Sequence, residues 1–139
     1  MEYEQNDLDN AALCVWKEAR GEQQAGMRAV AHVLFNRVGA VGFPHTLHDV
    51  VYQKNAFTSM SVSSDPEYSL MPPPNDPPYA YASQIVQAVA AGTDIDSTSH
   101  AHYYANLKNV TSGWFLNHIV KDTVLHPQTV VIGRQTFYL

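Results

Sequence analysis

The sequence predicts a mainly α-helical protein with a small β element (α+β class), organised as one domain over residues 1–139. Helical periodicity through the first forty residues, a further helical stripe near residue 85 and a β-branched run near the C-terminus carry this prediction. A chain of this length suits a single domain that buries about two thirds of its unfolded surface.

Two helices are expected near the N-terminus. Residues 8–18 place apolar side chains at helical spacing, and a second helix is expected from Gln23 to just before Gly39, a residue type that commonly follows helices. A tight turn at Arg20-Gly21 would join them into a hairpin. Glu18 therefore falls in the last turn of the first helix, where the negative end of the helix dipole disfavours a carboxylate.

The middle of the chain is less regular. Residues 46–52 open with a capping-box variant and predict a short helix. Residues 57–78 are rich in Ser, Pro and Asp, and their proline clusters argue against both helix and central strand. Because neither flank is long enough for a core of its own, we expect an ordered loop over a cleft rather than a linker. Residues 79–91 predict a third long helix, closed by Gly92.

The C-terminal part supplies the β element. Residues 101–106 are rich in aromatic side chains and suit either a strand or a loop at a cleft edge. Residues 129–132 are β-branched and predict a strand, Gly133 a turn or bulge, and residues 137–139 a possible return strand.

Composition narrows the class of protein. Hydrophobic residues at 45% and charged residues at 15% indicate a globular chain, and a net charge of −5 argues against a nucleic-acid partner. The single cysteine, Cys14, suits a reducing compartment and predicts no intramolecular disulfide. The acidic, polar N-terminus does not resemble a secretory signal, and no apolar run approaches the length of a membrane span.

Glu18 is the candidate catalytic residue. An acid set against the helix dipole and beside apolar neighbours such as Trp16 keeps its proton to higher pH than a free Glu, which is what a general acid requires. The simpler interpretation is that Glu18 pairs with Lys17 or Arg20. Spacing alone leaves both interpretations open.

A wider pattern surrounds this residue. The motif Glu18-Ala19-Arg20-Gly21-Glu22 is followed by further matching segments: Gly26, 29–38, Phe43-Pro44, 50–53, Phe57, 102–106, Trp114 and 133–138. In these residues the chain resembles the SleB-type (spore-cortex-lytic) cell wall hydrolases, a family that includes bacterial germination enzymes and bacteriophage endolysins. The resemblance covers nearly the whole chain, is most specific at the N-terminal block and fades over the Pro-rich middle.

The resemblance implies a lysozyme-like domain that cuts peptidoglycan glycan strands between N-acetylmuramic acid and N-acetylglucosamine, with Glu18 as general acid. It favours a lytic transglycosylase, in which one Glu acts as acid and then as base while the substrate's 6-hydroxyl closes a 1,6-anhydro ring. The expected setting is host lysis by a compact phage endolysin, released from the host cytoplasm through a separate membrane lesion. No cofactor and no metal are expected, and a monomer is expected.

Other residues of the pattern receive supporting or binding roles. Arg20 and Glu22 are expected to be structural, Arg20 at helix-end carbonyls and Glu22 as a cap of the next helix. Asn36 and Arg37 lie deep in the second helix and are expected to be scaffold. The candidates for sugar stacking or for hydrogen bonds to N-acetyl groups are Phe57, Tyr103, Tyr104, Asn106 and Trp114, although a buried aromatic cluster would explain the aromatic ones equally well. Two departures from the family pattern, Ala56 and Gln135, put polar contacts of the cleft in doubt.

Three alternatives stay open. A hydrolytic muramidase needs a second carboxylate, with the 65–76 loop the favoured source among Asp49, Asp65, Glu67, Asp76 and Asp122. A zinc-dependent peptidoglycan amidase is suggested by ligand-like spacing within two histidine pairs, His45/His48 and His100/His102. A non-catalytic peptidoglycan-binding module would keep the aromatic residues but would not need Glu18.

Overall fold

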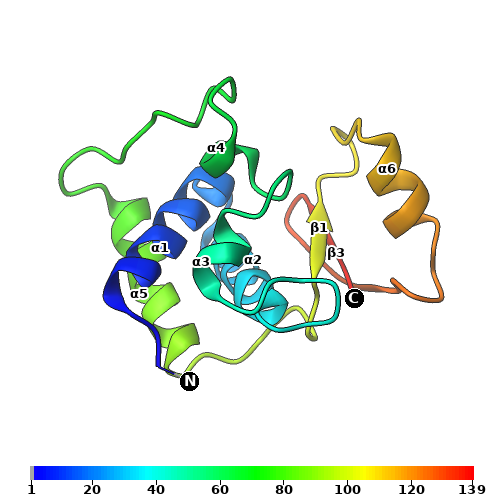
Figure 1. Cartoon of the computed structure of the whole chain (residues 1–139), viewed down its shortest axis with the longest axis horizontal. Helices are drawn as coiled ribbons and strands as arrows, with labels where there is room; N and C mark the ends of the chain where they lie inside the picture. The colour runs from blue at the N-terminus through cyan, green and yellow to red at the C-terminus, as the bar shows by residue number, and fades with distance from the viewer. Residues whose placement is uncertain (1) are drawn as a thin grey trace.

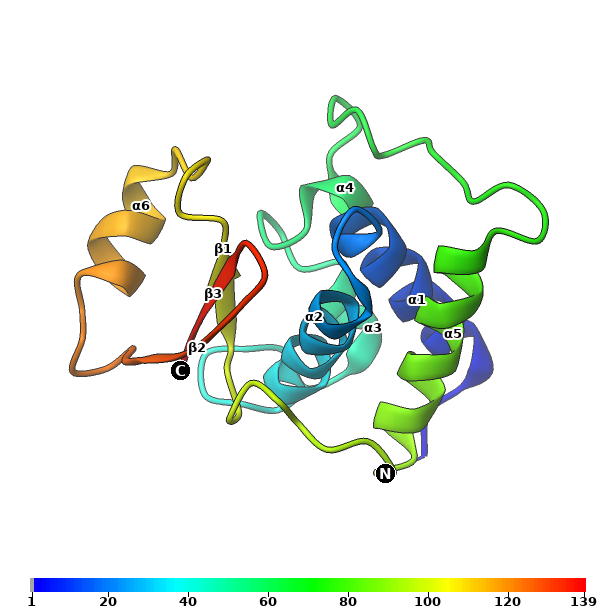
Figure 2. The same ribbon diagram turned by 180° about the vertical axis from the view of Figure 1, so that it is seen from behind.

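Three long helices pack against one another and enclose the main core of the protein (Figures 1 and 2). The structure is a computed structural model, and it describes residues 2–139. Its helical part consists of α1 (Gln5–Ala19), α2 (Gln24–Arg37), α3 (Leu47–Val51), α4 (Thr58–Ser61) and α5 (Pro77–Ala90). The remaining elements are β1 (Tyr103–Ala105), α6 (Gly113–Phe115), the π-helix η1 (Leu116–Val120), β2 (Gln128–Ile132) and β3 (Gln135–Tyr138).

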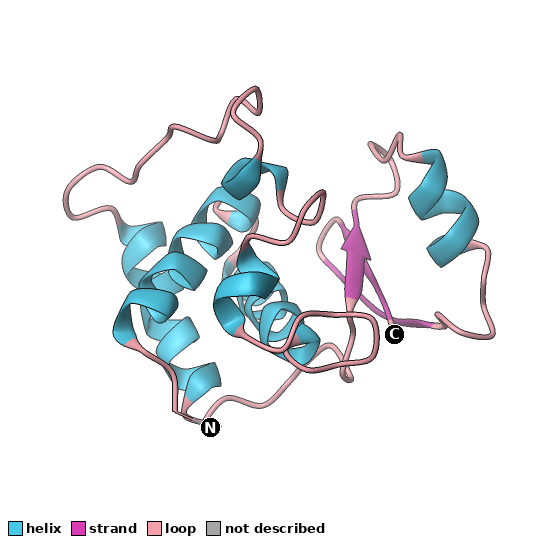
Figure 3. Cartoon of the chain, in the orientation of Figure 1, coloured by secondary structure: helices cyan, strands magenta, loops and turns pink. Residues whose placement is uncertain are grey.

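The strands, magenta in Figure 3, form an antiparallel sheet. In this sheet β3 lies between β1 and β2. All four residues of β3 are buried. Phe137 of this strand packs with Ala29 and Val33 of α2 in a second, smaller core. Because that contact fixes the sheet on α2, the same helix supports both the main core and the β element.

The fold class predicted from the sequence is confirmed: the protein is mainly helical with a small antiparallel sheet. The three long helices appear where periodicity placed them, β1 lies within 101–106, and β2 and β3 fall at 128–132 and 135–138, one residue earlier than expected for β2. One expectation about the Pro-rich region is wrong, because α5 begins at Pro77. Proline is tolerated there, since the first helical residues have no intrahelical partner for an N–H. Helices α4, α6 and η1 were not predicted, because elements of three to five residues are too short to show a period.

The Pro-rich segment is ordered by α1. Lys17 is buried and donates from Nζ to the carbonyl of Tyr68 at 2.7 Å, and the indole nitrogen of Trp16 donates to Asp76 Oδ2 at 2.8 Å. Both donors lie in the second half of α1. The segment 62–76 is therefore held along one side of this helix.

A second clamp holds the segment that enters the sheet. The carboxylate of Asp96 accepts hydrogen bonds from Asn36 Nδ2 (2.9 Å), from the backbone N–H (2.7 Å) and hydroxyl (2.6 Å) of Thr98, and from the backbone N–H of His100 (3.1 Å). Burial alone would raise the pKa of Asp96, but the hydrogen bonds from Thr98 and Asn36 outweigh it and lower that pKa. This carboxylate thus joins α2 to the chain that leads into β1.

Within residues 2–139 no helix has both the length and the apolar character that crossing a bilayer requires.

Asp96→Ala should lower the free energy of unfolding by about 2–4 kcal/mol, because several donors at a partly buried site lose their acceptor together. Urea denaturation of the variant and of wild type measures the difference. Glu2→Ala, an exposed carboxylate outside every helix and strand, is the control and should change stability by less than about 0.5 kcal/mol. Equal stabilities of the Asp96 and Glu2 variants would contradict the clamp.

Candidate active site

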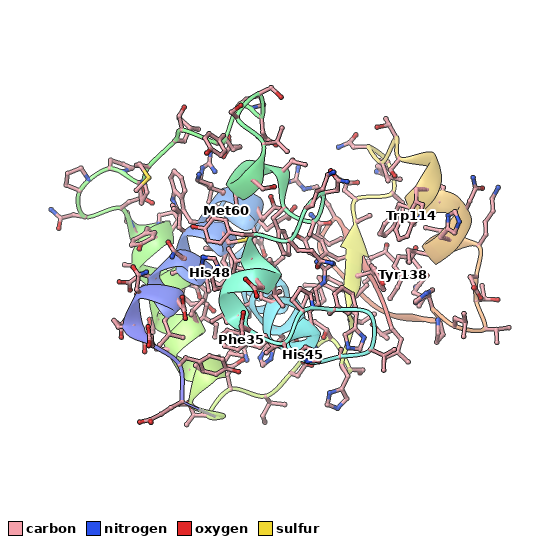
Figure 4. The ribbon with its side chains drawn as sticks, viewed as in Figure 1. Phe35, His45, His48, Met60, Trp114 and Tyr138 are labelled. Carbon is pink, nitrogen blue, oxygen red and sulfur yellow. The ribbon has the colours of Figure 1, made fainter. Side chains whose placement is uncertain are left out.

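A cleft of about 820 Å³ lies between the helical part and the segment that runs from β1 to α6. In Figure 4, Met60 of α4 marks the helical side and Trp114 of α6 the opposite side. The lining residues come from α1, α2, the α2–α3 and α3–α4 loops, β1, the β1–α6 loop and α6: Glu18, Arg37, Gly42, Phe43, Gln53, Lys54, Asn55, Ala56, Phe57, Tyr103, Tyr104, Ala105, Val110, Ser112, Trp114 and Phe115.

Glu18 is the one carboxylate among these lining residues, and two hydroxyl groups hold it. Ser59 of α4 donates to Oε2 at 2.8 Å, and Tyr104 of β1 donates to Oε1 at 2.9 Å. Each oxygen of the carboxylate thus has its own donor. Because α1, α4 and β1 each contribute one member, this group forms only when the helical part and the sheet are assembled.

The surroundings of Glu18 favour its protonated form. Burial is the largest influence and raises the pKa of Glu18; the hydrogen bonds from Ser59 and Tyr104 oppose the rise, the charge of Asp65 adds to it and that of Arg37 opposes it. The pKa of Tyr104 is raised well above its ordinary value, chiefly by burial and then by the negative charge of Glu18. Tyr104 therefore remains a hydroxyl donor, and Glu18 retains its proton to higher pH than a solvated glutamate.

Arg37 was expected to be a scaffold residue of the second helix. In the structure it also forms part of the cleft wall. Its guanidinium carbon lies 5.1 Å from the ring centroids of Phe43 and Phe57 and 5.5 Å from that of Tyr103. Its Nε donates to the carbonyl of His102 at 2.7 Å. Three aromatic rings thus surround one cation on the cleft wall.

Four of the five predicted sugar-binding residues line the cleft: Phe57, Tyr103, Tyr104 and Trp114. Trp114 is 58% exposed, and its ring stacks on His118 with centroids 5.1 Å apart, so it offers an open aromatic face. Asn106 is not among the lining residues. Its side-chain oxygen accepts from the backbone N–H of Lys108 at 3.1 Å, which gives it a turn-forming role, and its contact with an N-acetyl group stays a prediction.

The structure gives Arg20 the supporting geometry expected of it. Its guanidinium lies 4.3 Å from the Trp16 ring, donates to the carbonyls of Trp16 and Lys17 at the end of α1, and forms an ion pair with Glu67. Arg20 therefore connects the end of α1 to the Pro-rich segment.

Glu22 was expected to cap α2, and this expectation is wrong. Gln23 is the N-cap of α2, and it makes no side-chain cap bond. Instead, Glu22 Oε1 accepts from Arg134 at 3.2 Å and from Gln135 Nε2 at 3.3 Å. Glu22 ties the α1–α2 corner to the β2–β3 hairpin. Gln135, one of the two departures from the family pattern, therefore belongs to this tie and not to the cleft wall, whereas Ala56 does line the cleft.

The loop 62–76 does not lie over the cleft, because none of its residues is among those lining it; its contacts hold it against α1. Of the five carboxylates considered as a second catalytic group, the three favoured ones from this loop have other partners. Asp65 accepts from Thr58, Glu67 pairs with Arg20, and Asp76 accepts from Trp16. Asp49 and Asp122 are also outside the lining residues.

The histidines suggested by spacing do not form a cluster. Within the part of the chain that the structure describes, no three His, Cys, Asp or Glu side chains are grouped so that they could hold a metal ion. His102 instead stacks on Phe43, with ring centroids 5.8 Å apart.

Sequence reasoning missed Ser59, Arg37 as a wall residue and residues 53–55. Ser59 lies 41 positions from Glu18 in a four-residue helix, so no local pattern connects them. Gln53 lines the cleft, and its Oε1 is buried without a partner among the described residues.

Comparison with known proteins gives consistent matches over most of the chain. A family model described as Cell Wall Hydrolase matches residues 21–138, beginning just after Glu18. The spore cortex-lytic enzyme of Oceanobacillus iheyensis is 33% identical over 135 residues, which is 97% of this chain and 42% of that protein. The corresponding enzyme of Bacillus cereus is 34% identical over 97% of this chain and 45% of that protein. The chain thus spans less than half the length of these relatives.

Two solved structures match in fold. The catalytic domain of the germination-specific lytic transglycosylase SleB from Bacillus anthracis superposes with a TM-score of 0.75 at 33% identity, over 99% of this chain and 97% of that one. The catalytic domain of the Bacillus cereus SleB protein gives 0.74 at 33% identity, over 99% and 93%.

Glu18→Gln should raise the melting temperature relative to wild type by an amount that grows with pH. The raised pKa means that wild type loses stability as pH rises from the unfolded to the folded pKa of Glu18, whereas Gln carries no charge to bury. Calorimetry of both proteins from about pH 4 to about pH 8 measures the difference. A difference that is constant or shrinks with rising pH would contradict a raised pKa.

Proposed function

This chain belongs to the cell wall hydrolase family, and we propose that it is a peptidoglycan glycosidase that acts as a lytic transglycosylase. The proposed cleavage lies between N-acetylmuramic acid and N-acetylglucosamine. The observation that carries the proposal is Glu18, which is held by two hydroxyl groups in a cleft with aromatic walls and has a raised pKa. The likeness to the SleB catalytic domain from Bacillus anthracis, named as a lytic transglycosylase, supports the reaction type.

In the first step, protonated Glu18 transfers its proton to the glycosidic oxygen as the bond from that oxygen to C1 of the muramic residue breaks. The N-acetylglucosamine side leaves with a free 4-hydroxyl, and positive charge develops at C1. The hydroxyl groups of Ser59 and Tyr104 keep the new carboxylate in place.

In the second step, the carboxylate of Glu18 removes the proton of the muramic 6-hydroxyl while O6 bonds to C1. The product is a 1,6-anhydro ring, no water is consumed, and Glu18 regains its proton. An intramolecular hydroxyl has an effective molarity that bulk water does not match when the cleft holds the ring correctly. The aromatic wall formed by Tyr103, Tyr104 and Trp114 helps by excluding water.

Glu18→Gln should lower the rate of peptidoglycan cleavage by about 10²- to 10⁴-fold, because Gln keeps the size of the side chain but has no proton to transfer. Release of soluble muropeptides from purified peptidoglycan measures the rate. Glu67→Gln is the matched control and should retain most activity, because Glu67 lies outside the cleft.

A folded Glu18→Gln protein with near wild-type activity would refute the assignment. If the Glu67 variant, or Asp65→Asn or Asp76→Asn, were as inactive as the Glu18 variant, a muramidase with a second carboxylate would replace the transglycosylase mechanism.

The released muropeptides should end in 1,6-anhydro-N-acetylmuramic acid and be lighter than hydrolysis products by the mass of one water. Mass spectrometry before and after borohydride reduction distinguishes the two, because an anhydro end has no reducing group. Reducible muramic ends as the main product would indicate hydrolysis.

For the biological setting, the proposal is host lysis by a phage endolysin that reaches peptidoglycan from the host cytoplasm through a separate membrane lesion. This part rests on the sequence resemblance alone. The relatives reported above are spore cortex-lytic enzymes, and the similar Bacillus anthracis domain is named as germination-specific, so spore germination is the other setting to consider.

A further inference from the structure

We propose that the cleft selects glycan strands that carry free carboxylates, and that Arg37 is the specificity-determining residue that binds one of them. Lys54, which is exposed and also lines the cleft, adds to the attraction. This inference rests on the proposed function and deepens it, because it names the chemical group on the strand that the cleft recognises.

The charge of the cleft differs in sign from that of the whole protein. The chain has a net charge of −5, yet the charged residues lining the cleft are Arg37, Lys54 and the single acid Glu18. Since Glu18 must be protonated to act, the competent cleft has a local charge of about +2. A neutral strand gains nothing from that charge, whereas an anionic strand does.

Arg37 is also the arginine that lacks an acidic partner. Arg20, Arg28 and Arg134 pair with Glu67, Asp94 and Glu22. Within residues 2–139, no carboxylate lies within 4.0 Å of Arg37, although only 7% of this residue is exposed. A buried charge without a counter-ion is unfavourable, and the surrounding aromatic rings offset part of that cost.

The geometry leaves the binding end of the guanidinium available. Nε is occupied by the carbonyl of His102, and no acceptor for the two terminal nitrogens lies among the described residues. Both terminal nitrogens keep some solvent-accessible surface, and Arg37 is one of the residues that line the cleft. The rings of Phe43, Phe57 and Tyr103 fix the plane of the group. A fixed guanidinium fork matches a carboxylate with two parallel hydrogen bonds.

Of the two sugars in the strand, muramic acid is the one that has a carboxylate. Its lactyl ether ends either in a free carboxylate or in a peptide stem that carries its own. Both sources present the same chemistry to Arg37. The competing explanation is that Arg37 only orders the aromatic wall, and it predicts an equal effect of substitution on charged and neutral strands.

The test measures the effect of changing the enzyme and the effect of changing the substrate, separately and together. Three soluble strands are compared: strands with intact peptide stems, strands stripped of peptide so that lactyl carboxylates are free, and stripped strands whose carboxylates have been converted to neutral methylamides. Values of kcat/KM are measured for wild type, Arg37→Gln, Arg37→Lys and Lys54→Gln, the last being a matched loss of one cleft cation.

Wild type should prefer stripped or stem-bearing strands over neutral strands by about ten- to a hundredfold, the usual range for hydrogen bonds to a charged group. Arg37→Gln should reduce the preference to about twofold or less, Arg37→Lys should retain part of it, and Lys54→Gln should retain most of it. Preference for stripped strands identifies the lactyl carboxylate, and preference confined to stem-bearing strands identifies the stem.

An equal loss on charged and neutral strands in Arg37→Gln would overturn the inference and leave Arg37 a structural residue. If that variant does not fold, the measurement on wild type is sufficient, because equal kcat/KM values on charged and neutral strands would also overturn the inference. Absence of cleavage of every strand by folded wild type would instead refute the proposed function.

Discussion

The polar contacts between the elements converge on the carboxylate of Glu18 and its two hydroxyl donors. Ser59 reaches it from a short helix that Lys17 holds against α1, and Tyr104 reaches it from the edge of the sheet. The clamps at Asp96 and Glu22 act at a distance, because they fix the sheet on α2 and on the α1–α2 corner. Much of the polar network outside the helices therefore serves to bring three elements to one acid.

The site combines two opposing electrostatic requirements. Burial must keep Glu18 protonated, while the same cleft contains a permanent cation at Arg37 that favours the ionised form. The balance favours protonation, because burial is the largest influence on this pKa. Since Arg37 is stacked among aromatic rings rather than paired with Glu18, the two groups remain available for different parts of a ligand.

Sequence reasoning recovered what local patterns encode. The long helices have a clear period, and the position of Glu18 at the end of α1 follows from it. Contacts between distant segments could not be predicted from local periodicity, because they depend on how separate elements meet. Examples are the contacts of Ser59 with Glu18 and of Glu22 with Gln135. The accessibility of the terminal nitrogens of Arg37 depends on the same assembly. The loop 62–76 was misplaced for the same reason, since composition predicts its irregularity but not the side of α1 on which it lies.

The hydrogen bond between Tyr104 and Glu18 spans 86 residues, and β1 completes its pairing only with the last strand of the chain. Contacts of such high sequence separation form late, because the entropy of closing a long loop must be overcome before they contribute. A growing or truncated chain that lacks β3 still contains the acidic side chain but has no sheet edge to hold Tyr104 against it. The hydroxyl of Tyr104 can therefore hold Glu18 only after β3 has been synthesised and has paired with β1, although the acid itself lies on the first helix.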